Sequence, residues 1–588
     1  MNGIKLQFDF EDSAGITRRI VFSNPVEVIR ARTAAEVSPA LASIDRAIEL
    51  GLYAGGYLAY EAAAGFDDAL RTRENSDTDL LWFGLFRAPD PAIDPVWTSD
   101  FHFAEGDFDT SEAVYCEMVQ TIRDAISQGE TYQVNLSARF RSKFTGDPAV
   151  LYRRIATACG AKYCALLQTG TLSVTSFSPE MFFCTTGNRI VVRPMKGTSR
   201  RGRTVAEDTQ LAERLASSPK DQAENVMIVD LMRNDIGRIS QPGTVTVTKL
   251  FSLEQYPTVW QMTSEVSATL NAHVKLASVF GALFPCGSVT GAPKVTAMRR
   301  IAALERSPRG VYCGSIGFAA PGGDAIFNVA IRTAVFNHSD NTVTFGSGGG
   351  ITWDSNPQAE YEEMRSKSLV LRVNAWQMSL LESILLTNGT FLLLDQHINR
   401  LMKSASYFAI APNWPGIIQQ LDDLALQHPE GDWKVRLMLD SDTGLALEAI
   451  PLVKFCRLPL QAVLSTHAVD STDFKLYHKT TDRKIYTEQS KRNPNCDEVL
   501  MQNERGELTE FLNGNLVIES AGRLFTPPVT CGLLPGVMRE HLISVGQVQE
   551  CVLYPHNLYT ATRVWLINSV RGLVPVDFGR SHEQSNSI

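Results

Sequence analysis

Two pairs of acidic residues, more than a hundred positions apart, have the spacing of a metal site. Asp221 and Glu224 form one pair, and Glu360 and Glu363 form the other. A separation of three puts both carboxylates of a pair on one face of a helix. Two such helices facing each other would build an oxygen-rich pocket suited to Mg²⁺. Acids in the first turn of a helix more often only complement its dipole, so the spacing alone does not establish a metal site.

Lys196 and Arg332 are the cations near these acids that could do chemistry. A predicted strand, Arg189–Arg193, ends at Pro194, so Lys196 is expected in the loop that follows. A lysine in a loop is usually solvated, but in a cleft with a lowered pKa it becomes a nucleophile. Arg332 falls in a second predicted strand, Ala325–Phe336, among apolar neighbours. A guanidinium there needs an anion, which a substrate carboxylate would supply.

A run of glycines and a strand with polar side chains could also contribute to a site in this part of the chain. The run Gly346–Gly350 is predicted to be too flexible for a strand interior and suited to letting backbone amides approach a ligand. Its spacing does not fit a dinucleotide fingerprint. Polar and apolar residues alternate along the predicted strand Thr131–Phe140. Its polar face contacts either solvent or a functional site. That face carries Gln133, Asn135, Ser137 and Arg139.

Six segments in one order resemble the chorismate-utilising enzymes. The resemblance implies an α+β, chorismate-binding fold of β-sandwich and α-helices like anthranilate synthase component I. It also implies Mg²⁺ bound by the two acid pairs, with Glu224 and Glu363 closest, to neutralise the ring carboxylate of chorismate. The segments are Gly129–Asn135, Ser178–Glu180, Arg193–Thr198, Asp230–Asp235, Gly287–Lys294 and Gly348–Glu363.

Two positions discriminate among members of this family. Isochorismate and salicylate synthases have a lysine base where this sequence has Gln133, and anthranilate synthases have alanine where it has Lys196. The lysine form resembles aminodeoxychorismate synthase component I, in which this lysine is thought to attack C2 of chorismate and expel the C4 hydroxyl. Ammonia then displaces the lysine and enters at C4. Anthranilate synthesis is the alternative that Lys196 argues against.

The same resemblance implies roles for further residues. Glu180 would be the acid for the departing hydroxyl. Gln261 stands where anthranilate synthases have a histidine, so only hydrogen bonding is expected of it. The sequence shows no glutaminase-like cysteine elbow and no His-x-Glu partner, so a separate glutamine amidotransferase subunit is the expected ammonia source. Substrate contacts are expected at Gln133, Gln261, Ser288, Tyr312, Arg332, Gly348 and Gly349.

The last third of the chain carries a second set of chemical residues. Lys479 is followed by Glu510, and Pro535-Gly536 opens a predicted helix whose unpaired amides could cradle a phosphate. With His397–Leu401 added, the set resembles the fold-type IV pyridoxal-phosphate enzymes, of α+β fold. The resemblance implies Lys479 as the Schiff-base lysine and Glu510 as the partner of the pyridine nitrogen. Around the phosphate it places Arg400, Val537, Met538 and Ser569.

This second family includes aminotransferases and 4-amino-4-deoxychorismate lyase, and the spacing does not choose among them. A non-catalytic module is a further alternative. The fusion favours the lyase, because the product of the first part is its substrate. The expected function is therefore bifunctional synthesis of 4-aminobenzoate for folate. Relatives of the second part are often dimers, so a homodimer is expected.

Two regions must position these residues: 1–375, with a subregion 1–108 and a catalytic core 109–375, and 376–588. Long strands mix with amphipathic helices in the first, for example Ser111–Ile126. Short strands dominate the start of the second. Hairpins are predicted at Asn388-Gly389 and around Asn503–Gly506.

Composition sets the remaining limits. The net charge is −9 and the pI about 5.7, without a basic stripe, which argues against nucleic acid. The sequence has no leader pattern and no long apolar run, so a cytoplasmic protein without a membrane segment is expected. The 10 cysteines form no CxxC pair and are expected to be reduced.

Overall fold

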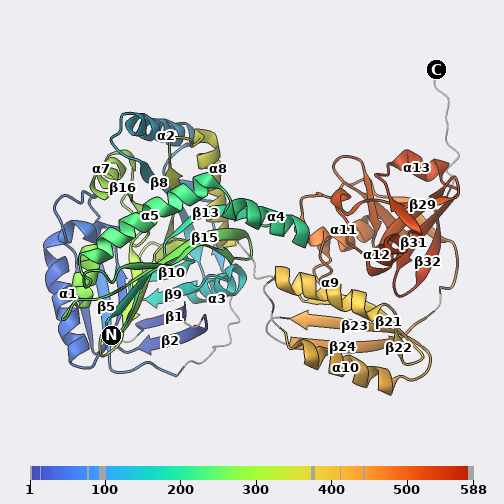
Figure 1. Cartoon of the computed structure of the whole chain (residues 1–588), viewed down its shortest axis with the longest axis horizontal. Helices are drawn as coiled ribbons and strands as arrows, with labels where there is room; N and C mark the ends of the chain where they lie inside the picture. The colour runs from blue at the N-terminus through green and yellow to red at the C-terminus, as the bar shows by residue number, and fades with distance from the viewer. Residues whose placement is uncertain are drawn as a thin grey trace. The chain divides into compact units, whose positions relative to one another are not determined.

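The computed structural model describes residues 3–12, 15–75, 78–91, 101–372, 378–408, 410, 412–440, 444–453 and 455–579. The chain divides into two compact units, Met1–Arg200 with Ala212–Ala375, and Arg201–Leu211 with Trp376–Ile588 (Figure 1). The domain boundary predicted between residues 375 and 376 lies outside the described residues. The grouping of Arg201–Leu211 with the second unit was not predicted.

Two antiparallel sheets form the first unit. One sheet runs in the order β16 (Gly291–Ala292), β8 (Gln133–Thr145), β20 (Thr342–Ile351), β19 (Thr333–Asn337), β10 (Leu172–Ser178), β9 (Tyr163–Gln168), β1 (Lys5–Glu11), β2 (Thr17–Ser23), with β6 (His102–Phe103) and β7 (Asp107–Phe108) beside β8. The other runs β13 (Met195–Arg200), β15 (Val259–Thr269), β12 (Arg189–Val192), β11 (Met181–Thr186), β18 (Ala325–Val329), β17 (Ser315–Ala319), β4 (Tyr53–Leu58), β5 (Leu81–Phe86), β3 (Glu27–Ala31), with β14 (Thr246–Gln255) beside β15.

Alternation in the sequence explains these strands. In β1, Leu6, Phe8 and Phe10 are buried while the residues between them are half-buried. Strand β1 pairs with β9, and β4 pairs with β17. The strands of residues 1–108 therefore share both sheets with the later residues.

Helices of the first unit carry both acid pairs, as predicted. Asp221 and Glu224 lie on α5 (Pro219–Gly237), which begins where the Ser218 hydroxyl accepts a hydrogen bond from the Asp221 amide. Glu360 and Glu363 lie on α8 (Pro357–Ser368). The other α-helices of this unit are α1 (Ala34–Glu49), α2 (Glu112–Ser127), which confirms the predicted helix, α3 (Pro148–Cys159), α6 (Leu276–Leu283) and α7 (Lys294–Leu304). Helix α4 (Val205–Ala216) begins in the second unit and ends in the first.

Two strand predictions were wrong. The predicted strand Ala325–Phe336 is two strands, because the chain passes from one sheet to the other at Arg332, whose φ is +51°. The run Gly346–Gly350 lies inside β20 rather than in a loop. Close packing leaves no room for a side chain at two of these glycines. A Cβ at Gly346 would lie 2.2 Å from the Tyr312 ring, and one at Gly348 would lie 2.1 Å from the Leu136 carbonyl oxygen.

The second unit has two sheets. The smaller contains β22 (Thr390–Phe391), β21 (Leu380–Thr387), β23 (Asp432–Asp440) and β24 (Gly444–Pro451) and packs with α9 (Leu394–Tyr407) and α10 (Trp414–Gln427). The larger runs β27 (Leu508–Phe511), β26 (Glu498–Gln502), β25 (Leu460–Leu464), β32 (Gly572–Asp577), β31 (Arg563–Asn568), β28 (Gly514–Ser520), β29 (Arg523–Thr526), β30 (Val548–Glu550), beside α11 (Lys484–Arg492), α12 (Val537–Ser544) and α13 (Pro555–Thr560).

Pairing of β27 with β28 closes part of the larger sheet into a ring. Both predicted hairpins are confirmed: β21 pairs with β22 across Asn388 and Gly389, which both have positive φ, and β26 pairs with β27. No helix among the described residues is long and apolar enough to span a bilayer.

Candidate active sites

A cavity of about 560 Å³ in the first unit collects most of the residues predicted for its site. They come from strands of both sheets, from α5 and α8, and from segments that connect these elements. Gln133 is not in the lining itself, but its side-chain amide lies close to Gly350, which is. The predicted residues that line the cavity are Glu180, Lys196, Asp221, Glu224, Gln261, Ser288, Tyr312, Arg332, Gly348, Gly349, Glu360 and Glu363.

Hydrogen bonds fix the backbone around Lys196, which lies in β13 rather than in a loop. The Asn225 amide donates to the Lys196 carbonyl oxygen at 3.3 Å. Gln261 donates to the Gly197 carbonyl oxygen at 2.9 Å and accepts from the Thr198 hydroxyl at 3.0 Å. Gln261 thus uses its amide to hold the segment that presents the lysine.

Lys196 and Glu180 have opposite pKa shifts. Burial lowers the pKa of Lys196, although the carboxylates of Glu224 and Glu180 oppose the effect. Burial raises the pKa of Glu180 to about 7. Its Oε1 has no hydrogen-bond partner among the described residues. Lys196, an amine that loses its proton more easily than usual, therefore lies near Glu180, a carboxyl group that keeps its proton longer than usual.

The side-chain amide of Gln133 lies close to the amine of Lys196. Its oxygen and nitrogen are both buried and have no partner in the part of the chain that the structure describes. A Cβ at Gly350 would lie 2.0 Å from Gln133 Nε2 and 2.9 Å from Lys196 Nζ. Gln133 and Lys196 therefore meet at Gly350, and the unsatisfied amide points to a ligand.

The acid pairs lie together but do not form a closed metal cage. A Cβ at Gly349 would lie 3.3 Å from Glu360 Oε2 and 4.0 Å from Glu363 Oε1. Burial raises the pKa of Glu224 and of Glu360, whereas Lys367, 2.7 Å from Glu363, lowers the pKa of that residue. No group of three or more acidic, histidine or cysteine residues among those described is close enough to hold a metal ion.

The polar face of β8 is a buried wall, which settles the alternative left open by the sequence. Arg139 is 1% exposed and pairs with buried Glu305 at 2.6 Å, and its guanidinium lies 5.3 Å from the centre of the Tyr312 ring. Arg332 lines the cavity, and no described carboxylate lies within 4.0 Å of it. Burial lowers the pKa of Arg332, so an anion at this end would be favourable.

A second cavity, of about 380 Å³, lies in the second unit. Lys479 and Glu510 line it, together with Arg400, Val537 and Ser569. The Met538 side chain instead packs in a hydrophobic cluster with Leu542 and Val548. Burial and the nearby Arg400 lower the pKa of Lys479 to about 8.

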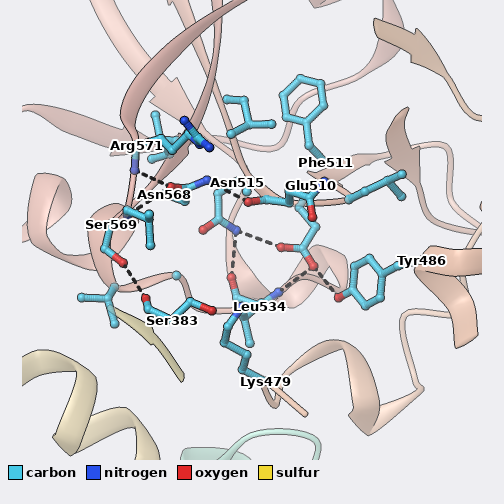
Figure 2. Close-up of a pocket in the computed structure, with 18 of the residues that line it drawn as sticks. Ser383, Lys479, Tyr486, Glu510, Phe511, Asn515, Leu534, Asn568, Ser569 and Arg571 are labelled. Carbon is cyan, nitrogen blue, oxygen red and sulfur yellow. Dashed lines mark hydrogen bonds between the residues drawn. The ribbon is translucent and has the colours of Figure 1, made fainter. Parts of the chain in front are cut away.

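Three donors hold the Glu510 carboxylate (Figure 2). Oε1 accepts from the Tyr486 hydroxyl at 2.8 Å and from the Leu534 amide at 3.2 Å. Oε2 accepts from the Asn515 amide at 3.1 Å. Burial nevertheless raises the pKa of Glu510 to about 7, so a cationic ring nitrogen would be a favourable partner.

Arg400 is held by a buried acid. It donates to both oxygens of Glu382 at 2.8 and 2.6 Å and to the Pro535 carbonyl oxygen at 3.1 Å. Burial would raise the pKa of Glu382, but Arg400 and His397 lower it to about 2. The bidentate pair fixes the guanidinium beside Gly536, which caps α12. The amides at this helix start fit a phosphate.

Sequence reasoning missed several of these residues. Glu382 is a lone acid in the apolar strand β21, which was a usable signal. Asn515 follows Glu510 across a hairpin turn, but nothing local marked it. Asn225 and Lys367 lie on the helices of the acid pairs, one position after Glu224 and four after Glu363. Tyr486 was recognisable only once its hydroxyl was seen against Glu510.

Residues 98–372 match the family model described as chorismate binding enzyme, and residues 379–577 match the model described as amino-transferase class IV. Aminodeoxychorismate synthase component 1 of Klebsiella aerogenes is 41% identical over 44% of this chain and 56% of its own length. Anthranilate synthase component 1 of Aquifex aeolicus is 40% identical over 43% of this chain and 51% of its own length. The chain thus spans little more than half the length of these relatives.

A solved structure supports the fold of the first unit. Anthranilate synthase component I of Streptococcus pneumoniae is 26% identical, with a TM-score of 0.52 over 63% of this chain and 91% of that one. The predicted fold, like anthranilate synthase component I and followed by a class IV domain of mixed α and β structure, is confirmed.

Proposed function

Because the chain joins a chorismate binding enzyme domain to an amino-transferase class IV domain, we propose that it makes 4-aminobenzoate from chorismate in two steps. The first domain aminates chorismate to 4-amino-4-deoxychorismate. The second removes pyruvate from that product, and 4-aminobenzoate serves folate synthesis. The observation that carries the proposal is Lys196, with a lowered pKa, near Glu180, with a raised one.

In the amination step, neutral Lys196 bonds to C2 of chorismate as the ring double bonds shift and the C4–oxygen bond breaks. Glu180, with a pKa of about 7, donates the proton that leaves with the hydroxyl as water. Ammonia then attacks C4, and the electrons shift back as the C2–nitrogen bond to Lys196 breaks. Arg332 and Tyr312 would hold a substrate carboxylate in the cavity.

The four acids line one cavity and offer the oxygen ligands and negative charge that a divalent cation prefers. Glu224 and Glu360 have raised pKa values because nearby positive charge does not offset their burial, and a cation would correct this. Glu224 and Glu363 would be the closest ligands, with Asp221 and Glu360 supporting them. Bound Mg²⁺ would neutralise the ring carboxylate of chorismate.

The second cavity fits pyridoxal phosphate. Glu510 would keep a proton on the ring nitrogen, and Arg400, Ser569 and the first amides of α12, at Val537 and Met538, would surround the phosphate. When bound, the cofactor supplies an electron sink. Lys479, with a pKa of about 8, is poised to remove the C4 proton of 4-amino-4-deoxychorismate, after which pyruvate leaves as the ring becomes aromatic.

We also propose partners and a location. A glutamine amidotransferase subunit would supply the ammonia, so the purified chain should use ammonium salts but not glutamine. The second domain would form a homodimer, which light scattering can test. The 10 cysteines are all unpaired, which supports a reducing location such as the cytoplasm.

Incubation of the purified chain with chorismate, ammonia, Mg²⁺ and pyridoxal phosphate tests the proposal. We expect 4-aminobenzoate and pyruvate, identified by chromatography against standards. Relatives named anthranilate synthase make anthranilate the second candidate product. Anthranilate, or no aromatic product, would refute the proposal.

A further inference from the structure

The lining of the second cavity contains more cations than acids. Arg400 is paired with Glu382, and Lys479 is the residue that would hold the cofactor. Glu498 and Glu510 are the acids of the lining, and Glu498 accepts a hydrogen bond from Asn513. The further cations of the lining are Lys434, Arg436, Arg483 and Arg571.

Two of these cations project from one strand. Lys434 and Arg436 are alternate residues of β23, so both side chains lie on the same face of the small sheet. Arg436 contacts Glu448 at 3.4 Å, but both side chains are more than a third exposed, so the pair is weak. Lys434 has no carboxylate within 4.0 Å among the described residues, and burial together with Arg436 lowers its pKa.

Arg571 faces the cavity from the turn after β31 (Figure 2). Its guanidinium lies 4.2 Å from the centre of the Phe455 ring, and Nη1 donates to the Val453 carbonyl oxygen at 2.6 Å. No carboxylate lies within 4.0 Å of it in the described chain. These contacts orient the guanidinium while leaving it without an anion.

We propose that Lys434, Arg436 and Arg571 bind the two carboxylates of a dicarboxylate substrate whose amine faces Lys479. A substrate with one carboxylate would leave at least one of the partly desolvated cations Lys434 and Arg571 without an anionic partner, which is unfavourable. The inference rests on the proposed function, since 4-amino-4-deoxychorismate carries a ring carboxylate and an enolpyruvyl carboxylate. It also distinguishes this site from that of an aminotransferase for apolar amino acids.

Kinetics of the full chain loaded with pyridoxal phosphate test this assignment. With 4-amino-4-deoxychorismate supplied, Lys434→Met and Arg571→Met should each raise KM about tenfold or more with little change in kcat, because each removes a charged contact to the substrate. Lys491→Met, at an exposed position on α11, is the control and should leave KM unchanged. The visible absorption of the bound cofactor should be the same in all variants. An unchanged KM in both test variants would overturn the inference while leaving the proposed function in place.

A binding measurement keeps the test independent of turnover. Isophthalate, with two carboxylates, and benzoate, with one, are titrated against the cofactor absorption of the unmutated holoenzyme. Isophthalate should bind about tenfold or more tightly than benzoate, and the preference should shrink in the two test variants. Equal affinity would overturn the inference. Failure of the unmutated chain to form 4-aminobenzoate would instead refute the proposed function, with the isophthalate preference still deciding the inference.

Discussion

At Lys196 and Glu180, burial moves two pKa values in opposite directions, and the proposed roles require both shifts. A buried amine loses its proton more easily and a buried carboxyl group holds its proton longer. The productive form has neutral Lys196 and protonated Glu180. Since Glu180 loses its proton as the pH rises through about 7, it limits the reaction on the alkaline side.

Glu180→Gln should therefore change the pH profile of amination as well as its rate. We expect kcat/KM to fall about a hundredfold or more, since a positioned acid is lost. The unmutated chain should show a bell-shaped profile. In the variant the alkaline decline should disappear, leaving a rise to a plateau as Lys196 loses its proton. An alkaline decline that persists in the variant would show that another group donates the proton.

Gly350→Ala tests the contact between Gln133 and Lys196. The new Cβ would lie 2.0 Å from Gln133 Nε2 and 2.9 Å from Lys196 Nζ, so both groups must move. Because misplacement by about 1 Å costs about a hundredfold in rate, we expect a loss of that size in amination with ammonia. Gly349→Ala, whose nearest contact would be 3.3 Å, is the matched control and should lose less. Equal losses would contradict the described geometry.

At the scale of elements, residues 201–211 belong with the second unit although most of their sequence neighbours belong with the first. Buried Arg201 pairs with Asp208 at 2.7 Å, and its guanidinium lies 4.3 Å from the centre of the Tyr407 ring. The Tyr407 ring in turn lies 4.2 Å from the ring of His478, the residue before Lys479. The segment thus packs, through Tyr407, against the residue that precedes this lysine.

Arg201→Met should destabilise the second unit. Removing Arg201 takes the cation of a buried ion pair away from the Asp208 carboxylate, which costs about 3–5 kcal/mol of unfolding free energy. Urea unfolding followed by the absorption of bound pyridoxal phosphate would measure it. Arg203→Met is the control, because its pair with Glu207 is partly exposed and should contribute at most about 1 kcal/mol. Similar losses in both variants would refute a special role for Arg201.

At the scale of the whole molecule, each cavity is lined by residues of its own unit. The two reactions should therefore be separable by mutation. Lys196→Ala should abolish amination but still convert supplied 4-amino-4-deoxychorismate, whereas Lys479→Ala should accumulate that compound from chorismate and ammonia. A mixture of the two variants should restore 4-aminobenzoate, as followed by chromatography. A mixture that forms no 4-aminobenzoate would contradict the proposal that the two reactions can be separated by mutation.

Local chemistry made much of this molecule predictable from its sequence. Helical spacing indicated the acid pairs of α5 and α8, and turn residues indicated the hairpin at Asn388-Gly389, because both signals depend on neighbours within a few residues. The order of the chemical motifs, with Lys196 and Lys479 among them, predicted both families.

Only the tertiary structure decided the rest. The glycines of β20 looked like a flexible loop, yet the Tyr312 ring and the Leu136 carbonyl, distant in sequence, require them in a strand. Arg332 looked like part of one strand, but the chain changes sheets there. The pKa values of Lys196 and Glu180, the donors around Glu510, and the lack of a carboxylate near Lys434 and Arg571 among the described residues depend on burial and on partners from other elements. Spacing along the chain carries no information about such contacts, because desolvation and charge act through space.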